Sequence, residues 1–174
     1  GTGWEPYPVS LRIVNWFKWY LKGNALSPDL LNSLVQQIRF LDKNIEYHLL
    51  GNHVLANAKA LIFAGVLFEK NEASDWRKKG VSLFEREIKE QILADGGHFE
   101  RSAMYHSIIL EDVLDLLNLV NLFPNEFCGS FHENLLSTAK KMSFWLRAMC
   151  HPDGEIAFFN DSAMKIAPTA SSIS

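Results

Sequence analysis

The sequence has only two cysteines, Cys128 and Cys150, among its 174 residues. They form no CxxC pair and have no metal-ligand spacing with a histidine, so the sequence predicts neither a zinc ribbon nor a disulfide framework. Apolar runs are short as well, since none approaches the roughly 18 to 20 residues of a membrane span. The opening GTGWEPYPVS also lacks the basic region and apolar core of a signal peptide. We therefore predict no membrane span.

Basic charge is equally scarce. The formal net charge is -3 and the pI is near 6.1, whereas nucleic-acid-binding proteins usually carry a basic excess, so no nucleic-acid partner is predicted. The chain has no GxSxG, P-loop or GxGxxG motif, which removes the usual hydrolase and nucleotide-binding interpretations. His48 and His53 lie five residues apart, unlike the histidines of HExxH. We predict no metal and no cofactor.

Hydrophobic residues make up 48% of the chain and aromatic residues 12%, which is typical of a globular domain with a large core. Apolar residues recur with the 3.6-residue period of helices, and no alternating strand pattern is present. Residues 1–174 are therefore predicted to form a single all-α domain of antiparallel helical hairpins. The prolines of WEPYPVS favour an extended lead-in, with Ser10 as a helix cap. Helices are expected at residues 11–20, 28–41, 53–69, 73–94, 102–122 and 131–149.

The segment EYHLLGNHVLANAKAL, residues 46–61, carries polar side chains in a stretch that otherwise predicts a buried helix. Burying an unpartnered amide or imidazole costs about 1 to 3 kcal/mol, so these side chains have internal partners or belong to a site. Asn52 is equally compatible with an N-cap, and His53 with a hydrogen-bonded core histidine. Small residues, among them Ala60 and Gly65, indicate an inner helix that its neighbours approach closely.

A second polar cluster, DGGHFERSAMYH, begins with a glycine-rich loop that Asp95, Gly96 and Gly97 are expected to shape. Arg101 and Tyr105 are four residues apart and would share a helix face. From the residues alone, Arg101 is equally compatible with an ion pair or a solvated helix start, and Tyr105 with a core ring whose hydroxyl is bonded. The other candidates of this cluster are His98, Glu100, Ser102 and His106.

Three segments, PYPVSLRIVNWFKW, EYHLLGNHVLANAKALIFAG and DGGHFERSAMYH, together resemble the helical domain of the heparinase II/III-like polysaccharide lyases. The resemblance covers residues 4–120 and extends through HPDGEIAFFNDS to residue 162. It implies part of an incomplete (α/α) toroid that binds an acidic polysaccharide, followed by a β-sandwich domain that this sequence lacks. The chain is then expected to be a fragment of a periplasmic or secreted lyase, with the remainder of the parent chain as its partner.

The resemblance also implies a mechanism, β-elimination at a uronic acid, which removes the C5 proton and expels the glycosidic oxygen at C4. Asn52 takes the role of neutralising the carboxylate with help from His53, and Tyr105 shuttles the proton. A tyrosine can do this when positive charge nearby stabilises its phenolate, and Arg101 or a histidine would supply that charge. Substrate contacts are assigned to Arg101, His106, His98 and Glu100, and supporting hydrogen bonds to His48, Glu46 and Asn57.

Two other functions stay open. The first is a noncatalytic glycan-binding helical domain, in which the tryptophans stack on sugar rings. The second is an (α/α)-barrel glycoside hydrolase, which needs two carboxylates across a cleft. Asp95 with Asp153 or Asp161 would have to supply that pair, and Asn52 and Tyr105 would then be unused. Reaction products separate the three, because only a lyase creates an unsaturated uronate that absorbs in the ultraviolet.

Overall fold

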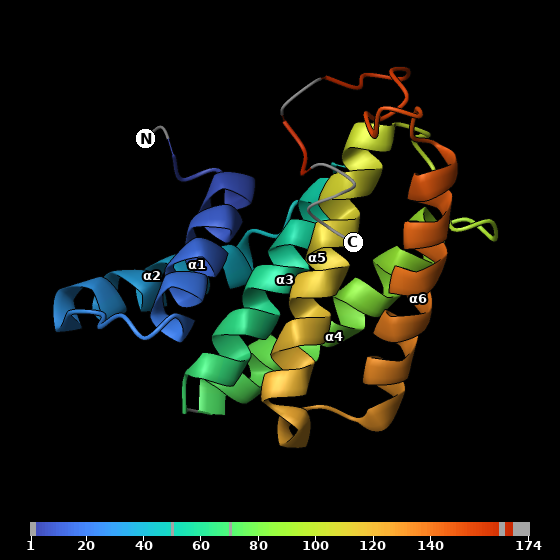
Figure 1. Ribbon diagram of the computed structural model, residues 1–174. Helices are drawn as coiled ribbons and strands as arrows, with labels where there is room; N and C mark the ends of the chain where they lie inside the picture. Colours follow the sequence, from blue (N-terminus) through green and yellow to red (C-terminus); the bar gives the residue numbers. More distant parts are fainter. Residues whose placement is uncertain (1–2, 50, 70, 164–165, 169–174) are drawn as a thin grey trace. The chain divides into compact units, whose positions relative to one another are not determined.

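The computed structural model describes residues 3–49, 51–69, 71–163 and 166–168. In this part of the chain all regular structure is helical, apart from two isolated β-bridges that pair Ile92 with His98 and Cys150 with Ile156. The prediction of an all-α chain is confirmed, and each expected helix is present (Figure 1). The elements are α1 (Pro6–Leu21), α2 (Pro28–Lys43), α3 (Asn52–Leu67), α4 (Asn71–Gln91), α5 (Ala103–Leu122), the 3-10 turn η1 (Pro124–Glu126) and α6 (Gly129–Ala148).

The helices form two compact units, Gly1–Arg86 and Glu87–Ser174, and α4 carries the chain from the first into the second. In the first unit, α1 packs on α3 and α2, and α2 also contacts α3. In the second unit, α5 and α6 run antiparallel to each other (Figure 1). The single domain expected for residues 1–174 stays a prediction.

The first helix begins earlier than predicted. Pro6 and Pro8 lie in the first turn of α1, and Glu5 is its extended N-cap, so the extended lead-in expected for these prolines is wrong. Proline is tolerated there because the backbone N–H that it lacks would have no partner within the helix. Ser10 is consequently no cap. It lies inside α1, where its hydroxyl donates to the carbonyl of Pro6 at 2.9 Å.

α3 is the inner helix that its small residues predicted. Every residue from Val54 to Gly65 is buried. Two glycines let α4 come close: a Cβ on Gly65 would lie 2.5 Å from the Cβ of Arg77, and a Cβ on Gly80 would lie 2.8 Å from the carbonyl oxygen of Ala58. Helices α3 and α4 thus each contribute one glycine where they approach each other. Helix α3 is enclosed along most of its length.

The glycine-rich loop between α4 and α5 packs against α6. Gly96 has a φ of 90°, and a Cβ there would lie 2.5 Å from the carbonyl oxygen of Lys141. Gly97 is required for space alone, because its Cβ would lie 2.5 Å from the indole nitrogen of Trp145. Asp95 closes the loop by accepting a hydrogen bond from the N–H of Gly97 at 2.9 Å. The loop-shaping role predicted for these residues is confirmed.

Candidate functional site

Asn52 is the first residue of α3. Gly51 precedes it as the N-cap, with a φ of 88° that favours glycine. The alternative that Asn52 caps the helix is therefore wrong. Its side chain makes a tertiary contact instead, because Nδ2 donates to the hydroxyl of Tyr7 at 3.3 Å. Tyr7 lies in the first turn of α1 and was not among the residues that sequence reasoning selected.

The His53 imidazole is held from two directions. Its Nδ1 lies 3.3 Å from Oε2 of Glu46, and its ring stacks on the ring of Tyr7 with the centroids 4.4 Å apart and the planes 27° apart. The His53 side chain is 35% exposed, whereas that of Glu46 is 8% exposed. An imidazole that reaches solvent is thus paired with a carboxylate that is nearly buried, an arrangement suited to contacting a ligand from a fixed orientation.

Asn57 lies one helical turn further into α3 and is fully buried. Its Nδ2 donates to Oγ of Ser10 at 3.0 Å and to Oε2 of Glu46 at 3.4 Å. Its Oδ1 accepts a hydrogen bond from the backbone N–H of Glu46 at 3.1 Å. One carboxamide therefore ties α3 both to α1 and to the segment that precedes Asn52. Glu46 and Asn57 thus have internal hydrogen-bond partners, and the supporting role at a substrate site predicted for them stays a prediction.

Replacing Asn57 by alanine is expected to lower the free energy of unfolding by about 2 to 4 kcal/mol. The buried N–H of Glu46 would lose its acceptor, and the Glu46 carboxylate and the Ser10 hydroxyl would each lose a donor. Denaturant titration of the purified protein measures the change. The control is Asn32→Ala at an exposed position of α2. Equal unfolding midpoints for the two variants would contradict the prediction.

His48 is placed differently from its neighbours. Its side chain is exposed in the turn before α3, so it is not part of the buried network that Glu46 and Asn57 form. The supporting role expected for His48 stays a prediction. Most polar side chains of residues 46–57 nevertheless have partners within the described part of the first unit, and two of those partners, Tyr7 and Ser10, come from α1.

In the second unit, Ser102 is the N-cap of α5 and accepts a hydrogen bond from the N–H of Tyr105 at 3.4 Å. Arg101 precedes this cap with a φ of 54°, in the left-handed region. The expectation that Arg101 and Tyr105 share a helix face is therefore wrong, because Arg101 lies outside the helix. Arg101 and Glu100 are both exposed, while Tyr105 is half-buried in the first turn of α5.

His98 and His106 are fully buried next to each other. The N–H of His98 donates to Nδ1 of His106 at 3.3 Å, and Nε2 of His106 donates to the carbonyl of Met142 at 2.9 Å. Nε2 of His98 contacts Oε1 of Gln91 at 3.1 Å. The ring of His106 also lies 4.5 Å from that of Trp145, measured between centroids. These contacts join the loop before α5 to α6, and direct substrate binding by either histidine stays a prediction.

Both histidines are held in their neutral form. Burial lowers the pKa of His98 to about 4, and the charge of His106 acts in the same direction. Burial also lowers the pKa of His106 to about 4, although the hydrogen bond to Met142 and the nearby Asp95 oppose the shift. Desolvation penalises an imidazolium strongly, and for His106 it outweighs both opposing effects. These two side chains are therefore uncharged at neutral pH.

A segment near the end of the chain covers the start of α5. Oγ of Ser162 lies 3.1 Å from Oγ of Ser102 and accepts a hydrogen bond from the N–H of Met104 at 3.4 Å. Nδ2 of Asn160 donates to the carbonyl of Arg101 at 3.2 Å. Two side chains from HPDGEIAFFNDS thus hold the turn that carries Arg101 and Tyr105. Sequence reasoning did not select them as site residues.

The carboxylates of the hydrolase alternative lie in turns. The carboxylate of Asp95 accepts a hydrogen bond from the N–H of Gly97 at 2.9 Å, and that of Asp153 accepts one from the N–H of Glu155 at 3.0 Å. Asp161 has a φ of 59° in the segment that covers α5. Because two of the three carboxylates are used to close their own turns, the structure does not favour the hydrolase alternative.

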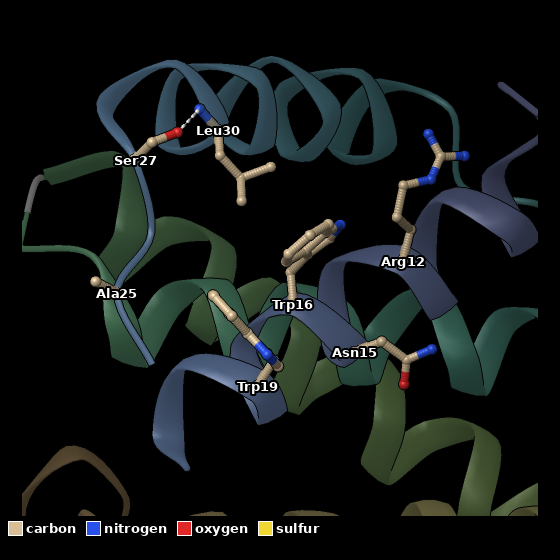
Figure 2. Close-up of a pocket in the computed structure, with 7 residues that line it drawn as sticks. All are labelled: Arg12, Asn15, Trp16, Trp19, Ala25, Ser27 and Leu30. Atoms are coloured by element: carbon tan, nitrogen blue, oxygen red, sulfur yellow. Dashed lines mark hydrogen bonds between the residues drawn. The ribbon is translucent and has the colours of Figure 1, made fainter. Parts of the chain in front are cut away.

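A separate surface hollow in the first unit has a volume of about 780 Å³, within the range of small-molecule sites. Figure 2 shows the indole of Trp16 pointing from α1 toward Leu30 of α2. Trp16 and Trp19 meet edge to face, with ring centroids 5.6 Å apart. Ser27 caps α2 at the rim and accepts a hydrogen bond from the N–H of Leu30 at 3.3 Å. The lining residues are Arg12, Asn15, Trp16, Trp19, Ala25, Ser27 and Leu30.

The fold and these clusters define an all-helical protein with a group of hydrogen-bonded polar side chains at the first turn of α3 and another at the first turn of α5. No helix within the described ranges is both long and apolar enough to cross a membrane. Over the same residues, no group of three or more His, Cys, Asp or Glu side chains is arranged to hold a metal ion. The chain belongs to the family described as heparinase II/III N-terminus, which matches residues 1–172.

Its relatives include two proteins named heparin-sulfate lyase. The chain is 30% identical over 167 residues to the one from Bacteroides stercoris and 32% identical over 173 residues to the one from Pedobacter heparinus. These alignments cover 92% and 91% of this chain but 25% of each relative, so the chain spans about a quarter of their length.

Solved structures agree. The heparan sulfate lyase HepC from Pedobacter heparinus matches with a TM-score of 0.64 and 31% identity, over 86% of this chain and 24% of that one. A heparinase III structure matches with a TM-score of 0.71 and 26% identity, over 87% and 24% of the respective chains. The predicted family and the predicted fold class are confirmed.

Proposed function

We propose that the protein to which these residues belong is a polysaccharide lyase that cleaves uronic-acid glycans by β-elimination. The proposal is supported by membership of the heparinase II/III N-terminal family and by relatives that are named heparin-sulfate lyases. Because the chain spans about a quarter of those relatives, the activity is proposed for the complete protein. The substrate class is an acidic polysaccharide with a uronate next to the cleaved bond.

The adjacent Asn52 and His53 carry the proposal. A carboxamide and an imidazole stand side by side in the first turn of α3, and both are held by Tyr7. The positive end of the helix dipole favours a negative charge near these residues. Neutralising a uronate carboxylate makes its C5 proton more acidic, which is the main obstacle to elimination. Asn52 and His53 are therefore proposed to bind the carboxylate.

Tyr105 is proposed to move the proton. As a phenolate it takes the C5 proton, the electron pair forms the C4–C5 double bond, and the bond from C4 to the glycosidic oxygen breaks. The tyrosine then returns the proton to that leaving oxygen, so one residue serves first as base and then as acid. Arg101, exposed beside the start of α5, is proposed to contact acidic groups of the glycan, and the exposed Glu100 to accept hydrogen bonds from its hydroxyl groups.

The test is ultraviolet absorbance while the complete natural protein is incubated with a panel of glycans. The panel contains heparan sulfate, heparin and alginate as uronic-acid substrates, and a neutral glucan as the control. The expected result is a rise on at least one uronic-acid glycan and none on the glucan. New reducing ends without a rise in absorbance would instead identify a hydrolase and overturn the proposal.

The second candidate is glycan binding without cleavage, and the hollow around Trp16 and Trp19 favours it. Indole rings stack on the apolar faces of sugars, and Arg12 and Asn15 at the same hollow offer donors for acidic and hydroxyl groups. Saturable binding of a uronic-acid glycan with no product on any substrate would support this second function over the first.

A further inference from the structure

Tyr7 touches both residues of the Asn52–His53 pair with different parts of its side chain. Its hydroxyl accepts a hydrogen bond from Nδ2 of Asn52 at 3.3 Å. Its ring stacks on His53, with centroids 4.4 Å apart and an angle of 27° between the planes. A phenylalanine at this position would keep the stacking and lose the hydrogen bond, and a leucine would lose both.

The backbone that carries Tyr7 is unusually restricted. Pro6 and Pro8 flank it in the first turn of α1, and each proline ring fixes its own φ near the helical value. Two and three residues later in this helix, the buried Val9 and Ser10 anchor the same part of α1 in the core. Ser10 is linked in turn to Asn57 of α3 at 3.0 Å. The phenol is therefore presented to α3 from a rigid support.

We propose that Tyr7 is a positioning residue that sets the orientation of Asn52 and His53 for binding a uronate carboxylate. This inference rests on the function proposed above. The carboxamide of Asn52 is planar and has two N–H donors, so fixing one N–H on Tyr7 also fixes the direction of the other. That second N–H and the imidazole of His53 can then converge on one carboxylate without a search through rotamers.

His53 is fixed by the combination of Tyr7 and Glu46. The tyrosine restrains the face of the imidazole, and Glu46 holds the ring by its Nδ1 edge at 3.3 Å. The opposite edge, with Nε2, is then the edge that can meet a substrate. With only one of these two contacts the imidazole of His53 could still tilt or rotate. Tyr7 and the carboxylate of Glu46 therefore act together to fix the ring.

The experiment compares Tyr7→Phe and Tyr7→Leu in the complete natural protein, with Tyr20→Phe as the control. Tyr20 lies near the other end of the same helix and is 46% exposed. Crystal structures of the variants report the orientations of Asn52 and His53, and ultraviolet assays on a uronic-acid glycan report kcat and KM separately. Thermal unfolding shows whether each variant is folded, and Tyr7→Phe keeps the test valid if Tyr7→Leu is not.

In Tyr7→Phe we expect the Asn52 carboxamide to rotate while His53 keeps its place, and kcat to fall about 3- to 10-fold with KM within about 2-fold, the loss that one hydrogen bond predicts. In Tyr7→Leu we expect His53 to move as well and kcat to fall further. Tyr20→Phe should match the wild type in both measurements.

Unchanged orientations of Asn52 and His53 in both variants would overturn the inference whatever the activity. An unchanged kcat in Tyr7→Phe would also overturn it, because the carboxamide would then need no support. If the wild type gives no ultraviolet signal on any glycan, the proposed function fails instead, and the crystal structures still decide whether Tyr7 orients the pair.

Discussion

Replacing Tyr105 by phenylalanine is expected to lower kcat on a uronic-acid glycan by about 10² to 10⁴, the range that general acid–base groups contribute. The proposed mechanism uses the phenol twice, so its removal leaves neither a base for C5 nor an acid for the leaving oxygen. The ring is half-buried in the first turn of α5 and would keep its packing. Ultraviolet absorbance of the product measures the effect in the complete natural protein.

Two further measurements separate a chemical effect from a structural one. The N-cap contact to Ser102 uses the backbone N–H of Tyr105 and survives the substitution, so the melting temperature should change little. Tyr20→Phe serves as the control and should retain full activity. A Tyr105→Phe variant that keeps more than about a third of the wild-type kcat would assign the proton transfer to another residue, since losing a general acid–base group costs far more.

The periodic pattern of apolar residues was sufficient to predict the helices. α2 begins at Pro28, as expected, and its serine cap followed by proline is a local signal of a helix start. The predicted start of α1 is wrong, because proline suggests an extended lead-in although it is allowed in the first turn of a helix. Spacing alone predicts a shared helix face for Arg101 and Tyr105, because it does not reveal the left-handed backbone of Arg101 before the cap.

The sequence singles out residues of the candidate site only where they are close together in the chain. Asn52, His53 and Asn57 stood out because polar groups are rare in a segment with this apolar pattern. Tyr7 and Ser162 did not stand out, since their partners Asn52 and Ser102 lie 45 and 60 residues away. A tyrosine beside prolines or a serine in a terminal loop carries no local sign of a tertiary contact, so only the folded chain reveals these supports.

Acidification is expected to destabilise the second unit through His98 and His106. Their folded pKa values of about 4 lie below the ordinary histidine value of 6.5, so the unfolded chain binds protons in this window and the folded chain does not. Stability is then complete above pH 6.5 and is lost as the pH falls from 6.5 toward 4. At pH 5 each histidine lowers the free energy of unfolding by about 2 kcal/mol relative to pH 7.5.

Burial is the main reason that both rings resist a second proton, and the lack of acceptors at the two Nδ1 atoms acts in the same direction. Nδ1 of His106 accepts the N–H of His98, and Nδ1 of His98 has no partner among the described residues, so a proton on either nitrogen would be buried without an acceptor. Denaturant titrations from pH 7.5 to pH 4.5 measure the effect. His106→Gln should be less stable at pH 7.5 yet lose about half of the pH dependence, whereas His151→Gln, at an exposed position, should retain all of it. A pH dependence that is the same in both variants would show that the buried pair does not control acid stability.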